Sequence, residues 1–217
     1  MKESVIIFDL DGTLIDSMCL WREVDIEFLN KRCIAMPSDL FVNLKSNSIK
    51  DTAVYFKERF SLKETIDEII DEWIEATMYY YKNTIKLKSD ALILLDYLRE
   101  KKNKILAIGT SNMYSLTEAV LKLNGILHYF TTIVTGCTII QGKPEPDIYL
   151  QVAWNLKVNP SDCLVFEDSL VGVQAAKNAG MRVYAIEDES ALEQKQDIIK
   201  IADKYFTNFA EVISQLK

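Results

Sequence analysis

Short, continuous runs of apolar residues recur along the chain and alternate with longer segments in which apolar positions follow a helical period. Each run is three or four residues long, contains β-branched side chains and is followed by polar residues, which is typical of strands buried on both faces of a parallel sheet. The runs lie at 5–8, 105–108, 132–135, 164–166 and 183–186. Strands that alternate with helices predict a doubly wound α/β core.

Local signals mark helices between these strands. Ser115 and Glu118 have the spacing of a capping box. Pro146 suits the first position of a second helix. A third helix has a face of small residues that allows close approach to a sheet, and Gly180 ends it. We also predict that residues 87–101 form a helix that returns the chain to the sheet.

Residues 16–85 differ from the rest because they contain no strand pattern. Leu20, Val24 and Phe28 share one helical face, and Ser61 with Glu64 has the spacing of another capping box. Apolar positions then recur at spacings of three and four, at Ile66, Ile70, Trp73, Thr77 and Tyr80. This segment therefore predicts a helical insert between the first strand and the remainder of the core.

Polar residues gather where the predicted strands end. The first strand leads into an aspartate pair at 9–13, the second into hydroxyl and amide side chains at 109–112, and the fourth into two acidic residues at 167–169. The loop after the third strand contains a lysine at 142–144. In an open parallel sheet, ligands bind beyond the carboxyl ends of the strands, so we expect these groups to converge.

The convergent set suits phosphoryl transfer. Oxygen donors from Asp9, the Asp11 backbone and Asp168 make a hard site appropriate for Mg²⁺. Lys143 and Thr110 offer a positive charge and a hydroxyl group to an anion. One carboxylate can then act as a nucleophile that forms an aspartyl-phosphate, while the second moves a proton to and from the leaving group.

Four segments in order resemble the motifs of the haloacid dehalogenase (HAD) superfamily: Asp9 to Leu14, Thr110 after a strand, Lys143-Pro144 and Glu167-Asp168. The runs 142–149 and 166–176 look like its phosphatase and β-phosphoglucomutase branch. The resemblance covers the whole chain and implies a Rossmann-like parallel-sheet core, residues 1–15 and 86–217. It identifies the helical insert, residues 16–85, as an all-helical cap domain.

The resemblance also implies a role for each site residue. Asp9 would be the nucleophile, and Asp11 would be the general acid for the departing alkoxide and then the base for water. Because a halide leaves without a proton, Asp11 favours a phosphate ester over a haloacid as substrate. The implied metal ligands are Asp9, Asp11 through its carbonyl and Asp168, supported by Glu167. The implied phosphate-binding residues are Thr110, Ser111, Asn112 and Lys143.

Three functions stay open at this point. We favour a Mg²⁺-dependent phosphatase for a sugar or polyol phosphate, because Leu20 and Trp21 stand where the mutase branch typically has a histidine. The alternatives are a β-phosphoglucomutase-like phosphomutase and a non-catalytic binding protein of the same fold. Segment 44–48 is a candidate to face the substrate from the cap, although we slightly favour a surface role for Lys45. The roles of Trp21 and Lys45 stay open.

Composition narrows the partners. The 217 residues are 49% hydrophobic and 26% charged, a globular balance, with a formal net charge of −7. Such an acidic chain is poorly suited to wrap nucleic acid or to coat an anionic membrane. We find no apolar stretch near the ~20 residues of a membrane span. We therefore expect a cytoplasmic monomer that binds a small phosphorylated substrate.

The remaining reactive residue types exclude several chemistries. His128 is the sole histidine, so multi-histidine zinc or iron sites are impossible. None of the four cysteines forms a C-x-x-C pair, which excludes a zinc ribbon or a thioredoxin motif. We expect His128 to have a packing or surface role, and Cys137 and Cys163 to be small buried hydrophobic residues. The run 79–81 of three tyrosines is expected to be half-buried helix packing.

Overall fold

The computed structural model describes residues 2–40 and 49–216, and a six-stranded parallel sheet lies at its centre. The strand order is β3-β2-β1-β4-β5-β6, so the predicted α/β parallel-sheet fold is confirmed. The last, short strand escaped the sequence analysis. The strands are β1 Val5–Phe8, β2 Ile105–Thr110, β3 Phe130–Thr135, β4 Cys163–Glu167, β5 Arg182–Ile186 and β6 Lys204–Phe206.

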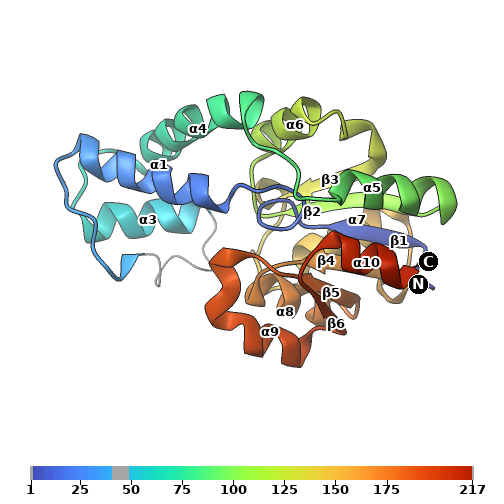
Figure 1. The fold of residues 1–217 in the computed structure, drawn as a ribbon. Helices are drawn as coiled ribbons and strands as arrows, with labels where there is room; N and C mark the ends of the chain where they lie inside the picture. The colour runs from blue at the N-terminus through green and yellow to red at the C-terminus, as the bar shows by residue number, and fades with distance from the viewer. Residues whose placement is uncertain (1, 41–48, 217) are drawn as a thin grey trace.

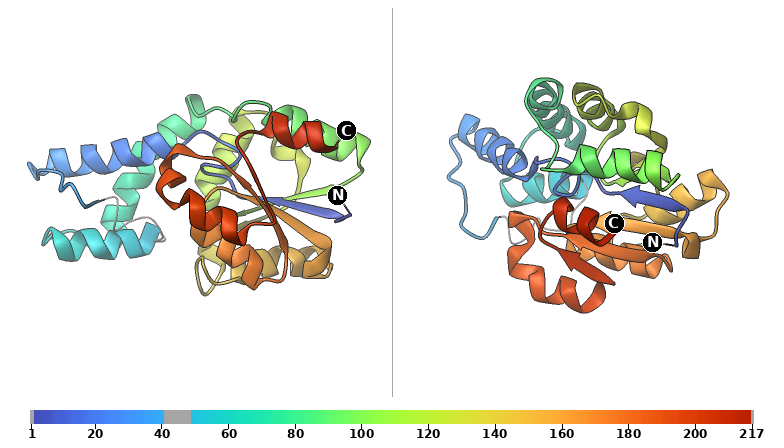
Figure 2. Two further views of the ribbon diagram at one scale, coloured as in Figure 1. Left: turned by 60° about the horizontal axis from the view of Figure 1, so that its bottom comes forward. Right: turned by 45° about the vertical axis from the view of Figure 1, so that its right-hand side comes forward.

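Helices cover both faces of the sheet (Figures 1 and 2). Ile6 and Phe8 of β1 point into the hydrophobic layer beneath α5, α6 and α10, whereas Val5 and Ile7 point into the layer beneath α7, α8 and α9. This alternation explains why β1 is apolar at every position. The helices are α5 Ala91–Asp96, α6 Tyr114–Leu123, α7 Asp147–Leu156, α8 Leu170–Asn178, α9 Lys195–Ile201 and α10 Phe209–Leu216. Short helices are η1 Tyr97–Lys101, η2 Leu127–Tyr129, η3 Gly136–Thr138, η4 Pro160–Asp162 and η5 Glu189–Gln194.

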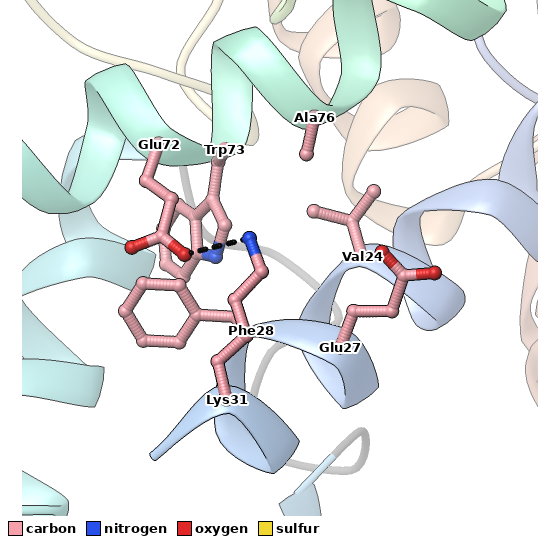
Figure 3. Close-up of a pocket in the computed structure, with 7 residues that line it drawn as sticks. All are labelled: Val24, Glu27, Phe28, Lys31, Glu72, Trp73 and Ala76. Carbon is pink, nitrogen blue, oxygen red and sulfur yellow. Dashed lines mark hydrogen bonds and ion pairs between the residues drawn. The ribbon is translucent and has the colours of Figure 1, made fainter.

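The predicted insert is helical in its described residues and lies beyond the carboxyl ends of the strands (Figure 1). Its helices are α1 Met18–Lys31, α3 Ile49–Arg59 and α4 Ile66–Asn83. Phe28, Phe56 and Trp73 pack ring against ring between them, with centroids 5.0–5.8 Å apart. Lys31 reaches from α1 across this seam and pairs with Glu72 of α4 at 3.1 Å (Figure 3). Segment 44–48, with Lys45, lies outside the described residues.

The insert joins the core by two chain segments and by α4. Asp16 N–H donates to the Lys86 carbonyl at 3.0 Å, and Lys88 N–H donates to the Leu14 carbonyl at 2.9 Å, so the two crossing segments pair with each other. Helix α4 lies beside α6 of the core in both Figure 1 and Figure 2. One hydrophobic layer therefore continues from the core into the insert. The division at residues 15/16 and 85/86 stays a prediction.

Neither predicted capping box forms where it was expected. The box at the start of α4 is formed by Thr65 and Glu68, while Ser61 has a left-handed backbone with φ of 49°. Helix α6 begins at Tyr114, so Ser115 lies inside its first turn instead of capping it. The helix predicted over 87–101 begins only at Ala91, because Leu87 pairs with Ile15.

Two expectations about burial are wrong or incomplete. On α4 the fully buried residues are Ile69, Trp73, Thr77 and Tyr81, whereas Ile66, Ile70 and Tyr80 are half-buried against the same core. Cys163 is buried as expected, but Cys137 is exposed. His128 is exposed in η2.

Among the described residues, no helix is both long and apolar enough to cross a membrane.

Candidate active site

Four charged residues meet where β1 and β4 end, and we call them the floor of the site: Asp9, Lys143, Glu167 and Asp168. Strands β1 and β4 are neighbours, with Phe8 paired to Phe166, so the residues that follow them lie side by side. The Lys143 ammonium donates to Asp9 Oδ1 at 2.6 Å and to Glu167 Oε1 at 2.5 Å. None of the four is more than 9% exposed. Loops distant in sequence thus bring one buried cation between two carboxylates.

Burial and charge set the protonation of the floor. Burial opposes a charge on Lys143, but Asp9 and Glu167 outweigh it and raise its pKa well above the ordinary value. Burial raises the pKa of Asp9 to about 8 against the opposing effect of Lys143. Burial also raises the pKa of Asp168, and the negative charges of Glu167 and Asp9 raise it further. Excess negative charge in a buried place favours a bound cation.

The Glu167 carboxylate accepts hydrogen bonds from several buried donors. Its burial would raise its pKa, yet Lys143 and several hydrogen bonds lower it below the ordinary value. Tyr149 OH donates to Oε1 at 2.9 Å, and the backbone N–H groups of Asp168 and Ser169 donate to Oε2 at 2.8 and 2.9 Å. Gly172 of α8 leaves the space for this carboxylate, since a Cβ there would lie 1.7 Å from Glu167 Oε1.

Asp168 is fixed by the loop after β1. Thr13 Oγ1 donates to Asp168 Oδ1 at 2.7 Å. Gly12 has φ of +81°, a conformation that favours glycine, and a Cβ there would lie 2.6 Å from Asp168 Oδ2. The D-x-D-G-T segment therefore shapes the floor through its glycine and threonine as well as through its aspartates.

The floor has the donors of a site for a hard divalent cation. Carboxylate oxygens of Asp9, Glu167 and Asp168 all lie within 4.8 Å of one another. Carboxylate oxygens suit Mg²⁺, which usually binds through one or two carboxylates and keeps several waters. The buried, like-charged donors thus fit the Mg²⁺ predicted from the sequence. Glu167 joins this cluster directly, although it also engages Lys143.

Asp11 points away from the floor into a second group of residues, which we call the rim: Asp11, Ser17, Trp21, Tyr81 and Asn112. Ser17 Oγ donates to Asp11 Oδ1 at 2.6 Å, and Asn112 Nδ2 donates to Oδ2 at 2.7 Å. Tyr81 OH also donates to Oδ1. The rim combines the β1 and β2 loops of the core with helices α1 and α4 of the insert.

The loop after β2 connects the two groups. Thr110 is buried, and its Oγ1 accepts a hydrogen bond from Asn112 N–H at 3.1 Å. Asn112 is buried as well, and Ser111 between them is half-buried. Gly136 of the next loop approaches so closely that a Cβ would lie 2.4 Å from the Ser111 carbonyl oxygen.

The structure thus brings Asp9, Lys143, Glu167 and Asp168 together, with Asp11 and Asn112 in the adjoining rim. Sequence reasoning missed Thr13, Ser17, Tyr81 and Tyr149 as contributors. Tyr149 belongs to the Lys143-Pro144 run and Thr13 to the first motif, so motif membership offered a signal for both. Tyr81 sits in a run of three tyrosines, whose pattern does not show which ring turns toward Asp11.

Comparison with known proteins places this geometry in a family. A family model described as haloacid dehalogenase-like hydrolase matches residues 6–186. The phosphorylated carbohydrates phosphatase of Thermotoga maritima is 29% identical over 182 residues, which are 83% of this chain and 84% of that protein. The fructose-1-phosphate phosphatase YqaB of Escherichia coli is 28% identical over 177 residues, or 81% of this chain and 92% of that one.

A solved structure supports the fold. The crystal structure of CbbY from Rhodobacter sphaeroides in complex with phosphate superimposes with a TM-score of 0.84. The alignment covers 97% of this chain and 96% of CbbY at 23% sequence identity. At that identity the similarity supports the fold alone, that is, the arrangement of the parallel sheet and the helical insert described above for this chain.

Proposed function

This chain belongs to the haloacid dehalogenase-like hydrolases, and we propose that it is a Mg²⁺-dependent phosphatase acting on a small sugar or polyol phosphate through an aspartyl-phosphate. The observation that carries this proposal is the buried floor, in which Lys143 contacts Asp9 and acidic oxygens cluster beside it. The names of two relatives, a phosphorylated carbohydrates phosphatase and a fructose-1-phosphate phosphatase, support the substrate class.

In the first step, Asp9 attacks phosphorus and the ester oxygen leaves. Lys143, already 2.6 Å from Asp9 Oδ1, reduces the repulsion between the carboxylate and the phosphoryl oxygens. The phosphoryl group is bound by the end of β2 and the loop that follows it, through Thr110, Ser111 and the Asn112 backbone. Their contribution is to hold it in line with Asp9, because positioning supplies much of the rate enhancement in such reactions.

Asp11 moves the proton. It donates to the departing alkoxide in the first step and accepts a proton from water in the second, when the aspartyl-phosphate is hydrolysed. Its carboxylate is turned into the rim and kept apart from the ion pairs of the floor. Two adjacent carboxylates thereby have different surroundings, which allows one to be a nucleophile and the other an acid and base.

The residues that would hold Mg²⁺ are Asp9, Asp168 and the Asp11 carbonyl, with Glu167 at their side. When bound, the ion supplies positive charge that stabilises the phosphoryl oxygens and lowers the pKa of nearby carboxyl groups. Lys143 of the floor likewise favours the charged form of Asp9 that a nucleophile needs. Thr13 and Gly12 keep Asp168 in place for this task.

The test is phosphate release from a panel of sugar, polyol and other metabolite phosphates, with and without EDTA. We expect release from at least one sugar or polyol phosphate and its loss in EDTA, with recovery on addition of Mg²⁺. Conversion of a β-hexose 1-phosphate to the 6-phosphate without phosphate release would identify a phosphomutase instead. Mg²⁺ binding without turnover of any compound would indicate a binding protein.

A further inference from the structure

Tyr81 is the innermost polar residue that the insert contributes to the site. It lies in the last turns of α4 and is fully buried. Its hydroxyl group donates to Asp11, a residue 70 positions earlier in the chain. Trp21 of α1 packs edge-on against its ring, with a centroid separation of 6.2 Å. A buried hydroxyl group that donates to a carboxylate of the site indicates a role beyond packing.

The direction of the Tyr81 proton follows from its partners. Trp21 Nε1 donates to the Tyr81 oxygen at 3.2 Å, and Asn112 Nδ2 donates to it at 3.1 Å. An indole N–H and an amide NH₂ are donors only, so the phenol oxygen accepts from both. Met113 N–H donates to Asn112 Oδ1 at 2.7 Å, which fixes the orientation of that amide. The single hydroxyl proton is left for Asp11 Oδ1.

We propose that Tyr81, oriented by Trp21, is a positioning residue that holds the Asp11 side chain for proton transfer. The inference rests on the proposed acid and base role of Asp11. The core provides one donor to Asp11 through Asn112, whereas the insert provides the Tyr81 hydroxyl group and, at its first residues, Ser17. Proper alignment of the acid therefore depends on the position of α4, while Asp9 is aligned by the core alone.

The test is Tyr81→Phe, which keeps the ring and removes the hydroxyl group. Its kcat/KM is measured on fructose 1-phosphate, whose alkoxide leaving group needs a proton, and on p-nitrophenyl phosphate, whose leaving group departs as an anion. Because the alcohol leaves when the aspartyl-phosphate forms, kcat/KM isolates the acid step. We expect a loss of roughly 10- to 100-fold on fructose 1-phosphate and of less than about 3-fold on p-nitrophenyl phosphate.

Two further variants keep the result interpretable. Trp21→Phe removes the donor that orients Tyr81 and should give the same selective loss, smaller in size. Tyr79→Phe is the matched control: it lies on the same helix, is 67% exposed, and should leave both activities unchanged. The thermal midpoint of each variant shows whether it is folded.

The outcomes separate the two proposals. An equal loss on both esters, or no loss on either, would overturn the positioning role of Tyr81 while leaving the phosphatase intact. If the unaltered protein releases phosphate neither from these esters nor from any compound of the panel, the proposed function itself is contradicted, and the role of Asp11 on which this inference depends is withdrawn with it.

Discussion

The floor and the rim of the site are built on different physical principles. The floor is a set of buried charges, with Lys143 between Asp9 and Glu167, and every member comes from the core. The rim is one carboxylate, Asp11, surrounded by three neutral donors, of which two, Ser17 and Tyr81, come from the insert. The proposed nucleophile and metal ligands are thus arranged by the core, whereas the proposed acid and base, Asp11, also has partners in the insert.

The energetic consequences differ as well. Removing one partner from a buried ion pair leaves an uncompensated charge, which costs about 3–5 kcal/mol. Removing one neutral donor to a carboxylate changes stability by only about 1.5–3 kcal/mol. Changes in the floor should therefore affect folding, metal binding and chemistry together. Changes in the rim should affect proton transfer and leave the remainder nearly intact.

The sharpest contrast is between the two aspartates. Asp9→Asn removes the nucleophile, and we expect steady-state turnover to fall by roughly 10⁴-fold or more. Asp11→Asn removes the proton donor and acceptor, so turnover should also fall, but by roughly 10²- to 10⁴-fold. Because the backbone carbonyl of Asp11 is unchanged, this second variant should still bind Mg²⁺. Phosphate release and isothermal titration with Mg²⁺ provide the two measurements.

The contrast fails under either of two results. Substantial turnover by Asp9→Asn would rule out an aspartyl-phosphate on this residue. Loss of Mg²⁺ binding by Asp11→Asn would show that the Asp11 side chain belongs with the floor, and the division drawn here between the two groups would be lost.

A substitution at Gly172, which belongs to neither the floor nor the rim, should have the next largest effect on activity. Gly172→Ala places a methyl group 1.7 Å from Glu167 Oε1, so either the carboxylate or α8 must shift. A displaced Glu167 no longer holds Lys143, and misplacement of about 1 Å in a site costs on the order of 10²-fold in rate. Overpacking should also lower the free energy of unfolding by about 1–3 kcal/mol. Activity assays and urea unfolding measure both effects.

Gly142→Ala is the matched control for this variant. Gly142 is exposed, and a Cβ there meets nothing within 4 Å among the described residues. The same change of residue should therefore leave stability within about 0.5 kcal/mol. If Gly172→Ala had the same activity and unfolding free energy as Gly142→Ala, the close packing of Glu167 against α8 would not be needed to position the floor.

The floor could be predicted from the sequence because short motifs sit at strand ends. Asp9 and Asp168 each follow an apolar run, and parallel strands end at one edge of a sheet, so their convergence follows from topology alone. Lys143 was assigned to the same place by its motif. The hydrogen bond from Tyr149 to Glu167 was not predictable, since it depends on how α7 packs against the sheet.

The contribution of α4 to the rim could not be predicted, because the pattern of α4 is ambiguous. Both Ser61–Glu64 and Thr65–Glu68 have capping-box spacing, and tertiary packing selected the second pair. Trp73 and Thr77 were placed on the buried face correctly, but the third tyrosine of the run, Tyr81, is buried where Tyr80 was expected. Helical periodicity tolerates a one-residue rotation, and that rotation decides which hydroxyl group reaches Asp11.

Strand β6, which escaped the pattern argument, shows a second limit of sequence reasoning. Lys204–Phe206 has only three residues, and only the last is buried. A strand this short at the edge of a sheet gives no apolar run. Its pairing with β5, Ala185 opposite Tyr205, is fixed by neighbours that the sequence does not place next to one another.

The smallest expected effect on activity comes from a change that should alter stability alone, in the link between the insert and the floor. Lys88 lies on the segment that returns from the insert, and its ammonium donates to Asp188 Oδ2 at 2.7 Å and to the Glu187 carbonyl at 3.1 Å. Asp188 follows β5, and its charge acts on Asp168 of the floor. Lys88→Met removes a charged hydrogen bond and should lower the free energy of unfolding at pH 7 by about 1.5–3 kcal/mol.

The pH dependence gives this prediction its sign. Burial opposes ionisation of Asp188, but Lys88 and Ser190 outweigh it and hold its pKa below the ordinary value of 3.8. A depressed carboxyl pKa stabilises the folded state above pH 3.8, and this contribution is lost as the pH falls through the folded pKa. The difference in urea-unfolding free energy between the unaltered protein and Lys88→Met should therefore shrink below about pH 4. It should also shrink in an Asp188→Asn background, where only the Lys88 bond to the Glu187 carbonyl is left. Lys200→Met, which breaks the exposed pair with Asp197, should change stability little at any pH. A difference as large at pH 3, or in Asp188→Asn, as in the unaltered protein at pH 7 would mean that the ion pair with Asp188 contributes nothing to stability.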